Sequence, residues 1–380
     1  MSAITRTELR SLPTGYATPC LGLNPAHTLE MKFRAMQEAD FPMVELGFGN
    51  YVAWVRSKVP NLPPSTCPEE WKVDDEPDPS DTQIWNALFD HTDELKALAQ
   101  RHELRLLMLQ PLNQFDGWPE GSERGEWVKR KVELWVKLCS RLTVDFLQVG
   151  ANDQADANGG DEKTAQDMRW LAEIASKQER PFAIAYEPWC FSPRYPEWEK
   201  CYEIVKKANH PNLGLCLDTA QMCLAPSYGI NPTSSQLISQ ETFSALLDRI
   251  RALPKETICY FEISDVLSPN PPLLQGSPFD DWHKKQGGGP ERSSWVMCAR
   301  AVPYVGRSAG KEVKGEEDLG VARVAEVAKA VFSTGFRGPV IWEPFEALVM
   351  EKEDPSVPQT YAQAGKVSRE KLFAHVLGDA

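Results

Sequence analysis

Residues 211–221 read PNLGLCLDTAQ, which contains a short apolar run that ends on an acid, Asp218. The same form occurs earlier in FAIAYE, which ends on Glu187, and later in PVIWE, which ends on Glu343. Continuous apolar runs of this length are typical of strands that are buried on both faces, as in parallel sheets covered by helices. The sequence therefore predicts an α/β fold with acids at the ends of several strands.

Outward from these runs, the chain contains eight units of an apolar run followed by a helical stretch. The expected strands are Ala17–Leu21, Met43–Leu46, Leu104–Leu109, Asp145–Val149, Phe182–Tyr186, Leu213–Leu217, Thr257–Ile263 and Pro339–Trp342. The expected helices are His27–Ala39, Thr82–Arg101, Glu126–Arg141, Asp161–Lys177, Pro196–Ala208, Gln240–Leu253, Gly320–Thr334 and Gly365–Leu377. Strands that alternate with helices favour parallel pairing with crossover helices.

Eight such units favour a closed (β/α)8 TIM barrel over an open doubly wound sheet. An open sheet usually has fewer strands and a glycine fingerprint after the first of them, and the chain contains neither G-x-G-x-x-G nor a Walker motif. We therefore expect residues 1–380 to form a single TIM-barrel domain. Long loops are expected at Asn50–Ser80, after the second strand, and at Asp265–Lys314, after the seventh. Both loops leave the carboxyl ends of strands, so we expect them to be lids or pocket walls.

The composition is that of an ordinary globular chain, with 42% hydrophobic and 25% charged residues, which excludes disorder as the main state. The formal charge of −13, without a basic stripe, argues against nucleic acid as a partner. No apolar run is long enough to cross a membrane, and the first ten residues lack the pattern of a secretory signal. We expect a cytoplasmic protein with nine reduced cysteines, and the sequence leaves a homo-oligomer open.

Four acids fall at or near the carboxyl ends of four consecutive expected strands: Glu187, Asp218, Glu262 and Glu343. Neighbouring strands of a barrel lie about 5 Å apart, so such acids converge on one centre if their side chains point inward. Four carboxylates that close cannot all ionise without a cation, because like charges raise one another's pKa. An all-oxygen ligand set suits Mn²⁺ or Mg²⁺ better than zinc. The sequence thus predicts one divalent metal ion, although any single acid could instead cap a helix or form a salt bridge.

Several spaced motifs carry a resemblance to a known family. They are YEPW at 186–189, PNLGLCLDTAQ at 211–221, FEISD at 261–265, LGLNPAHTLE at 21–30, LQP at 109–111, SW at 294–295, AR at 299–300 and PSVP at 355–358. In this combination the chain resembles the xylose-isomerase-like TIM-barrel superfamily of sugar isomerases and epimerases. Within that superfamily it is most similar to the fungal 3-dehydroshikimate dehydratases.

The resemblance implies a metal with four ligands, one on each of strands five to eight. In order, these ligands are Glu, Asp, either Gln or His, and Glu, and they correspond here to Glu187, Asp218, Glu262 and Glu343. Three positions depart from the family's pattern. Glu262 replaces a neutral ligand, which should tighten the binding of a hard ion and weaken its pull on a substrate carbonyl. Gln221 stands where several relatives have a proton-handling histidine, and glutamine can only orient a hydroxyl. Met297 replaces an arginine of the dehydratases, which leaves Arg300 as the cation available for a substrate carboxylate.

Other residues are candidates for contact with a substrate: Glu45, His27, Gln221, Arg300 and Trp295. His283 is a candidate catalytic base because the loop after the seventh strand should cover the site. Each has a structural alternative. Glu45 could cap the next segment, His27 could begin the first helix, Arg300 could form a structural ion pair, and Trp295 could be part of the core.

Three functions remain open from the sequence. The leading hypothesis is a divalent-metal-dependent carbon–oxygen lyase, a dehydratase of a small polyhydroxylated keto compound such as 3-dehydroshikimate, which acts through a metal-stabilised enolate. Its base would be His283, His27 or a ligand carboxylate. The second is a sugar isomerase or epimerase in which Glu187 and Glu343 exchange a proton on opposite sides of the substrate. The third is a barrel that keeps its metal but no longer catalyses a reaction.

Overall fold

Eight short apolar runs form the strands at the centre of the molecule. The computed structural model describes residues 4–71, 76–228, 230–234, 236–268, 272–311 and 320–379. Within this part of the chain, eight strands pair in parallel and close into a barrel. They are β1 (Thr14–Ala17), β2 (Met43–Gly47), β3 (Arg105–Leu112), β4 (Phe146–Gly150), β5 (Ala183–Glu187), β6 (Leu213–Asp218), β7 (Ile258–Ile263) and β10 (Val340–Trp342). The expected (β/α)8 TIM barrel is confirmed.

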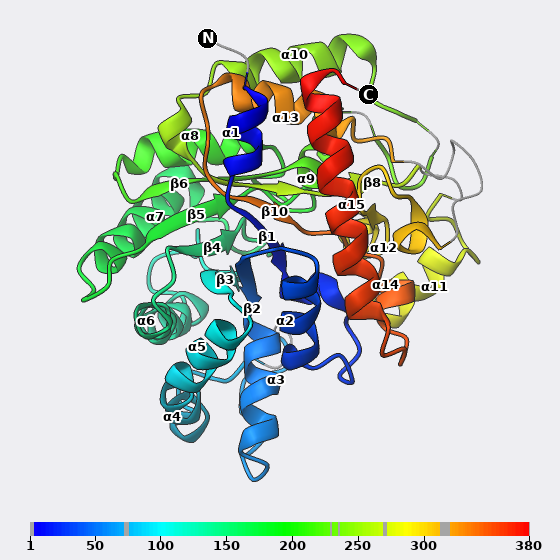
Figure 1. The fold of residues 1–380 in the computed structure, drawn as a ribbon. Helices are drawn as coiled ribbons and strands as arrows, with labels where there is room; N and C mark the ends of the chain where they lie inside the picture. Colours follow the sequence, from blue (N-terminus) through cyan, green and yellow to red (C-terminus); the bar gives the residue numbers. More distant parts are fainter. Residues whose placement is uncertain are drawn as a thin grey trace.

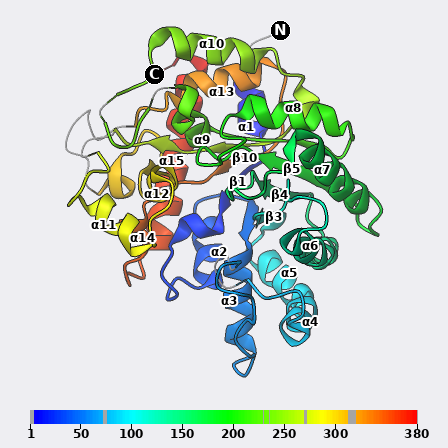
Figure 2. The same ribbon diagram turned by 180° about the vertical axis from the view of Figure 1, so that it is seen from behind.

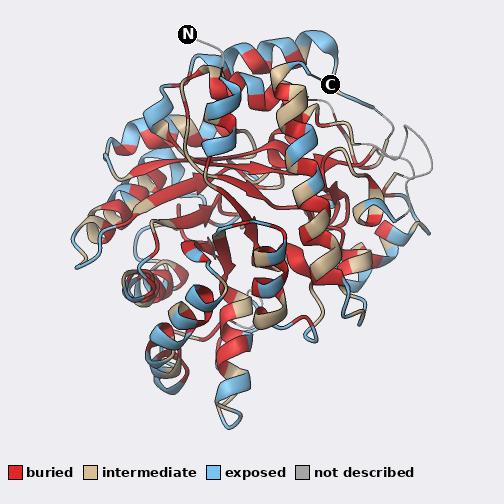
Figure 3. Ribbon diagram, in the orientation of Figure 1, coloured by how far each residue is buried: buried red, intermediate tan, exposed pale blue. Residues whose placement is uncertain are grey.

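Helices surround the barrel in both views of the fold (Figures 1 and 2). They are α2 (Leu29–Glu38), α3 (Phe48–Lys58), α4 (Thr82–Asp90), α5 (Thr92–Arg101), α6 (Glu123–Leu142), α7 (Gly160–Ser176), α8 (Trp198–Ala208), α10 (Gln240–Arg251), α13 (Val324–Ser333) and α15 (Val357–Leu377). In α8, apolar residues recur every three or four positions and are buried, whereas Lys206 and Lys207 are exposed. Figure 3 shows the same division on other helices, and buried strands lie between them.

The described part of the chain also contains shorter helices and strands. They are α1 (Arg6–Ser11), α9 (Thr219–Leu224), β8 (Asp265–Val266), α11 (Pro278–Lys285), α12 (Glu291–Cys298), β9 (Arg300–Ala301) and α14 (Ala347–Met350). The strands β8 and β9 pair antiparallel in a small sheet of their own. The segment Asp265–Lys314, expected as a long loop, therefore contains two helices and two strands, while residues 269–271 and 312–314 lie outside the described part.

Four expectations about secondary structure are wrong in detail. The last helix, expected over Gly365–Leu377, begins at Val357, because Pro358 fits the first turn of a helix. The first strand is Thr14–Ala17, not Ala17–Leu21, because Pro19 cannot donate a ladder hydrogen bond and Thr18–Leu21 forms a 3-10 turn. The helix expected over Thr82–Arg101 is divided at His91, where the hydroxyl of Thr92 donates to Phe89 O at 2.9 Å. The loop expected at Asn50–Ser80 begins inside α3, whose buried face includes Trp54 and Val55.

The register of the barrel brings the acids to one end. Gly150 pairs with Glu187, and Glu262 pairs with both Asp218 and Ile341. Because side chains alternate along a strand, residues two positions apart face the same side. None of the described helices is both long and apolar enough to span a membrane.

Candidate active site

Four buried carboxyl groups meet at the carboxyl end of the barrel. Glu187 and Asp218 are the last residues of β5 and β6, Glu262 is the penultimate residue of β7, and Glu343 directly follows β10. One oxygen of each carboxyl lies within 4.8 Å of those of the other three. Each of the four residues is at most 5% exposed. The structure thus brings together the acids that the sequence singled out, which we call the acid ring.

A positive charge already lies against this ring. Arg300, in β9, donates from Nη2 to Asp218 Oδ2 and to Glu343 Oε2, the latter at 2.6 Å. Its Nε donates to Ser264 Oγ at 3.0 Å. Burial opposes the charge of the guanidinium, yet Asp218 and Glu343 raise its pKa well above the ordinary value. Arg300 therefore forms ion pairs with two acids of the ring. The sequence left such a structural ion pair open as the alternative to contact with a substrate carboxylate.

The acids differ in their hydrogen bonds. Glu187 Oε2 accepts from Gln148 Nε2 at 2.5 Å and from Trp189 Nε1 at 2.7 Å. Burial, followed by the charges of Glu343 and Asp218, raises the pKa of Glu187 well above its ordinary value. Burial also raises the pKa of Glu343 to about 7, although Arg300 opposes the change.

Unpartnered oxygens show what the ring lacks. Glu187 Oε1 and both carboxyl oxygens of Glu262 are buried and accept no hydrogen bond in the described part of the chain. Burial, with the neighbouring Cys216 and Glu343, raises the pKa of Glu262 well above its ordinary value. Buried carboxylates without donors are costly unless a cation compensates them. The donor set, all carboxylate oxygen and close together, therefore fits a hard divalent cation.

A pocket of about 250 Å³ opens beside the ring. It is lined by Glu187, Glu343, Arg300 and Ser293, by the carboxamides Gln110, Asn113, Gln148 and Gln221, and by Pro19, Leu23, Pro111, Trp189, Phe191, Val296, Met297 and Phe345. Carboxamides both donate and accept hydrogen bonds, as hydroxyl groups do. The lining therefore combines groups that match a polyhydroxylated compound with an apolar wall.

Contacts behind the pocket hold its carboxamides. Gln110 Nε2 donates to Glu343 Oε1 at 3.4 Å, and Gln221 Oε1 accepts from Cys190 N at 3.0 Å. The backbone oxygen of Asn113 accepts from Lys131 Nζ at 3.0 Å, and Lys131 is fully buried in an ion pair with Glu76. These contacts position the side chains of Gln110 and Gln221 and the backbone at Asn113.

The indole of Trp189 requires a glycine opposite it. A Cβ on Gly150 would lie 2.1 Å from the Trp189 ring. Because Trp189 Nε1 donates to Glu187, the missing side chain at Gly150 lets the indole reach both the pocket and the ring acid.

Four of the candidates from the sequence do not line this pocket: the candidate base His283 and three candidate substrate contacts. His283 lies on α11, where Nδ1 contacts Ser294 Oγ at 2.5 Å. His27 precedes α2, and its Nε2 contacts Asp354 O at 2.9 Å. Trp295 is fully buried and packs against Phe279. The next two residues of α12, Val296 and Met297, line the pocket, so Trp295 lies on a different side of this helix. The fourth, Glu45, is fully buried in the middle of β2, and neither of its carboxyl oxygens has a hydrogen-bond partner among the described residues.

Four residues near the acids were not among the sequence candidates: Gln110, Asn113, Gln148 and Cys216. Three of them had a signal in the sequence. Gln148 is a polar residue inside the apolar strand β4, and Cys216 is two positions before Asp218 on β6, so it faces the same side. Gln110 is a polar residue in the apolar strand β3 and part of the LQP motif at 109–111. Asn113 had none, because it lies just after β3 and its position depends on the loop that begins there.

Comparisons with known proteins agree with this architecture. A protein-family model described as xylose isomerase-like TIM barrel matches residues 69–365. The 3-dehydroshikimate dehydratase of Neurospora crassa is 29% identical over 286 residues, which cover 72% of this chain and 73% of that protein.

Solved structures show the same fold. The IolI protein, crystallised with a bound zinc atom, aligns with a TM-score of 0.60 at 14% identity, over 96% of this chain and 98% of that one. A xylose isomerase-like TIM barrel/4-hydroxyphenylpyruvate dioxygenase fusion protein aligns with a TM-score of 0.64 at 19% identity. The alignment covers 96% of this chain and 43% of the fusion protein.

Proposed function

The chain belongs to the xylose isomerase-like TIM barrel family of enzymes, and on that premise we propose that it is a divalent-metal-dependent carbon–oxygen lyase. Its substrate would be a small polyhydroxylated keto compound of the 3-dehydroshikimate type. The observation that carries the proposal is the acid ring, four buried carboxyl groups with oxygens within 4.8 Å of one another beside a pocket. The named relative from Neurospora crassa supports the reaction class.

Glu187, Asp218, Glu262 and Glu343 would hold the metal, with Mn²⁺ or Mg²⁺ favoured by the oxygen donors. When bound, the ion would polarise a substrate carbonyl and stabilise the negative charge that develops as a neighbouring C–H proton leaves.

Either Glu187 or Glu343 would accept that proton, because both line the pocket whereas His27 and His283 do not. Loss of a β-hydroxyl would then complete the dehydration.

Substrate hydroxyls would bind the carboxamides. Asn113 Oδ1 and Gln148 Oε1 are buried acceptors without a partner, and both residues line the pocket. A hydroxyl that donates to either atom would satisfy it. Trp189, Phe191 and Met297 would cover the apolar faces of the substrate and exclude water from the reacting carbons.

The test is turnover by the purified protein with Mn²⁺ and 3-dehydroshikimate. Formation of protocatechuate, abolished by chelation and lowered by Glu343→Gln, is the expected result. Glu346→Gln is a matched control, since Glu346 is equally buried but bonds to Ser308 N and Tyr361 Oη and does not line the pocket. Protocatechuate formation that withstands exhaustive chelation would contradict the proposal.

A sugar isomerase or epimerase is the second candidate. It is favoured by two observations: Glu187 and Glu343 line one pocket, and the pocket has Met297 rather than a second cation beside Arg300. The same protein incubated with a panel of ketoses would separate the two, because an epimerase produces a new ketose, an isomerase produces an aldose, and neither produces protocatechuate. Failure to turn over either class would favour the non-catalytic barrel.

A further inference from the structure

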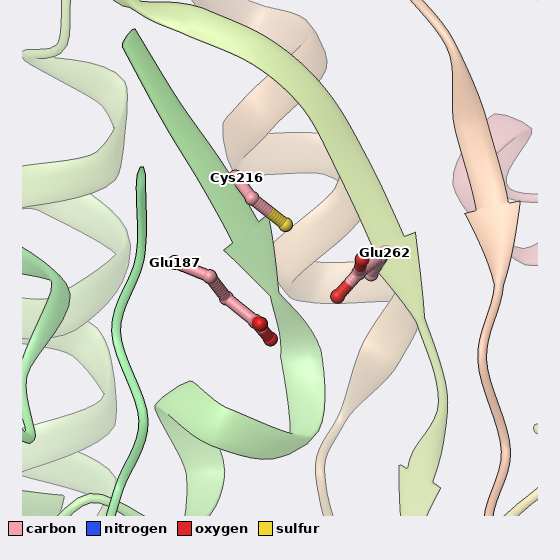
Figure 4. Close-up of side chains that lie close together, drawn as sticks. All are labelled: Glu187, Cys216 and Glu262. Carbon is pink, nitrogen blue, oxygen red and sulfur yellow. The ribbon is translucent and has the colours of Figure 1, made fainter. Parts of the chain in front are cut away.

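The pocket beside the acid ring, which we call the inner pocket, adjoins a larger outer chamber. The outer chamber has a volume of about 700 Å³, against about 250 Å³ for the inner pocket. Figure 4 shows Glu187 and Glu262 of the acid ring directed toward each other, and none of the four ring acids lines the outer chamber. The two spaces share six lining residues: Leu23, Asn113, Trp189, Phe191, Ser293 and Met297.

The outer chamber is more space than a substrate of one ring would use. Sites that bury a drug-sized ligand have volumes of about 300–1,000 Å³. The inner pocket lies below that range, and the outer chamber lies well within it. A single ring that reacts at the acid ring would therefore leave the outer chamber to water.

The walls of the outer chamber are tied to one another. Trp282, on α11, donates from Nε1 to Glu351 Oε1 at 2.8 Å, and Asn24 Nδ2 donates to Glu351 O at 2.9 Å. The backbone N–H groups of Leu23 and Asn24 both donate to Met350 O, at 2.9 and 3.1 Å. These contacts join the segments that follow β1, β7 and β10. The chamber is therefore held in shape by the carboxyl end of the barrel and is not a gap between independent loops.

The lining of the outer chamber suits a sugar ring. Trp189 and Phe191 line both spaces, and their ring centroids lie 5.1 Å apart. The C–H face of a sugar ring is apolar and packs on aromatic rings, whereas the hydroxyls at its edge need polar partners. Gln114 Oε1 accepts from Arg124 Nη2 at 2.7 Å, which leaves Gln114 Nε2 to donate, and Asp153 supplies a carboxylate acceptor.

The charge of the outer chamber argues against an anionic occupant. Among its described lining residues, two acids, Asp153 and Glu351, accompany one cation, Lys285, so the side chains sum to −1. Lys285 Nζ already lies 3.4 Å from Glu351 Oε2. A phosphate or a carboxylate would be repelled here, whereas an uncharged sugar would not. Met297, at the boundary with the inner pocket, likewise offers no charge to an acid.

We propose that the substrate carries a second, uncharged sugar ring, which binds in the outer chamber while the keto-bearing ring binds at the acid ring. The inference rests on the proposed function for the place of the reacting ring, and it narrows the substrate class to glycosides of a polyhydroxylated keto compound. Trp189, Phe191 and Met297 contact both rings at the boundary. Hydroxyls of the outer ring bind Gln114 and Asp153.

Binding of one-ring and two-ring sugars tests the proposal without the need for turnover. The full chain with Mn²⁺ is titrated, in a calorimeter, with fructose and with three glucosyl-fructoses that are joined through O3, O4 or O6 of the fructose. We expect at least one of these disaccharides to bind about tenfold or more tightly than fructose, because the added ring makes new hydrogen bonds and aromatic contacts.

Gln286→Trp is the variant that fills the outer chamber. Gln286 is exposed directly after α11 and lines the outer chamber but not the inner pocket, so a larger side chain there should leave the fold intact. The variant should lose the preference for the disaccharide and keep its affinity for fructose, which a folding defect would abolish. Gln100→Trp is the matched control, because Gln100 is exposed on α5, near the start of β3 at the opposite end of the barrel. It should keep the preference.

Asp153→Asn is a second variant, which should weaken binding of the disaccharide severalfold without a change for fructose. Equal affinity for fructose and every disaccharide overturns the inference, as does a lack of binding by all the disaccharides or a preference that survives Gln286→Trp. Turnover of 3-dehydroshikimate without any preference for a second ring would overturn the outer site and leave the proposed function standing. A preference that is lost in Gln286→Trp, without dehydration or epimerisation of any substrate, would do the opposite.

Discussion

Replacement of Arg300 by glutamine removes the positive charge that Asp218 and Glu343 share. The guanidinium and both carboxylates are at most 6% exposed, so solvent cannot screen the two acids once the charge is gone. Removal of one partner from a buried ion pair costs about 3–5 kcal/mol, because the other partner is left uncompensated. We therefore expect Arg300→Gln to lower the free energy of unfolding by about that amount in metal-free buffer.

A divalent ion at the acid ring should restore part of this loss. A ligand that binds only the folded state stabilises it by about 2.7 kcal/mol at one hundred times its Kd. With Mn²⁺ at one hundred times the Kd of the variant, the variant should regain about this amount. Its Kd should be lower than that of wild type, since the lost arginine no longer repels the ion. In wild-type protein, the gain at the same Mn²⁺ concentration should be smaller.

Urea unfolding with Mn²⁺ and with chelator measures both quantities. Arg292→Gln is the control, because Arg292 is on the neighbouring α12 and its Nε donates to Leu224 O at 2.9 Å, not to an acid of the ring. It should shift stability little and show the wild-type response to Mn²⁺. The reasoning is refuted if Arg300→Gln is as stable as wild type without metal, or if Mn²⁺ stabilises it no more than it stabilises wild type.

Three further predictions concern the pocket and its surroundings. Met297→Arg should lower KM for 3-dehydroshikimate roughly ten- to hundredfold, because a hydrogen bond between charged groups contributes about 1.5–3 kcal/mol. Steady-state kinetics measure this, and an unchanged KM would argue against a substrate carboxylate at this wall of the pocket. Gly150→Ala should displace Trp189, whose ring lies 2.1 Å from the added Cβ, and lower the free energy of unfolding by about 1–3 kcal/mol. Tryptophan fluorescence and thermal unfolding measure the two effects, and an unshifted emission spectrum would contradict the displacement. Burial raises the pKa of Asp116 to about 6 from 3.8, so the folded protein keeps a proton that the unfolded chain releases, and stability should fall as pH rises through this interval. Asp116→Asn should remove about 3 kcal/mol of that fall, measured as the difference from wild type in urea unfolding at both ends of the interval.

The sequence determined the barrel and the positions of its acids. Each strand is a local apolar run, and an acid at the end of a parallel strand must lie at the carboxyl rim once the barrel closes. Glu187, Asp218, Glu262 and Glu343 could therefore be placed without any knowledge of long-range contacts. The same alternation would have placed Cys216 on the inner face with Asp218, two positions along β6.

Only the tertiary structure decided what surrounds those acids. Arg300 meets Asp218 and Glu343 from a separate two-stranded sheet, 82 and 43 residues away in the chain. His283 and Trp295 failed to reach the pocket because the orientations of α11 and α12 depend on packing against the rest of the barrel. Local periodicity fixes which side of its own element a residue faces, but which neighbours that side meets is set by contacts between segments far apart in sequence.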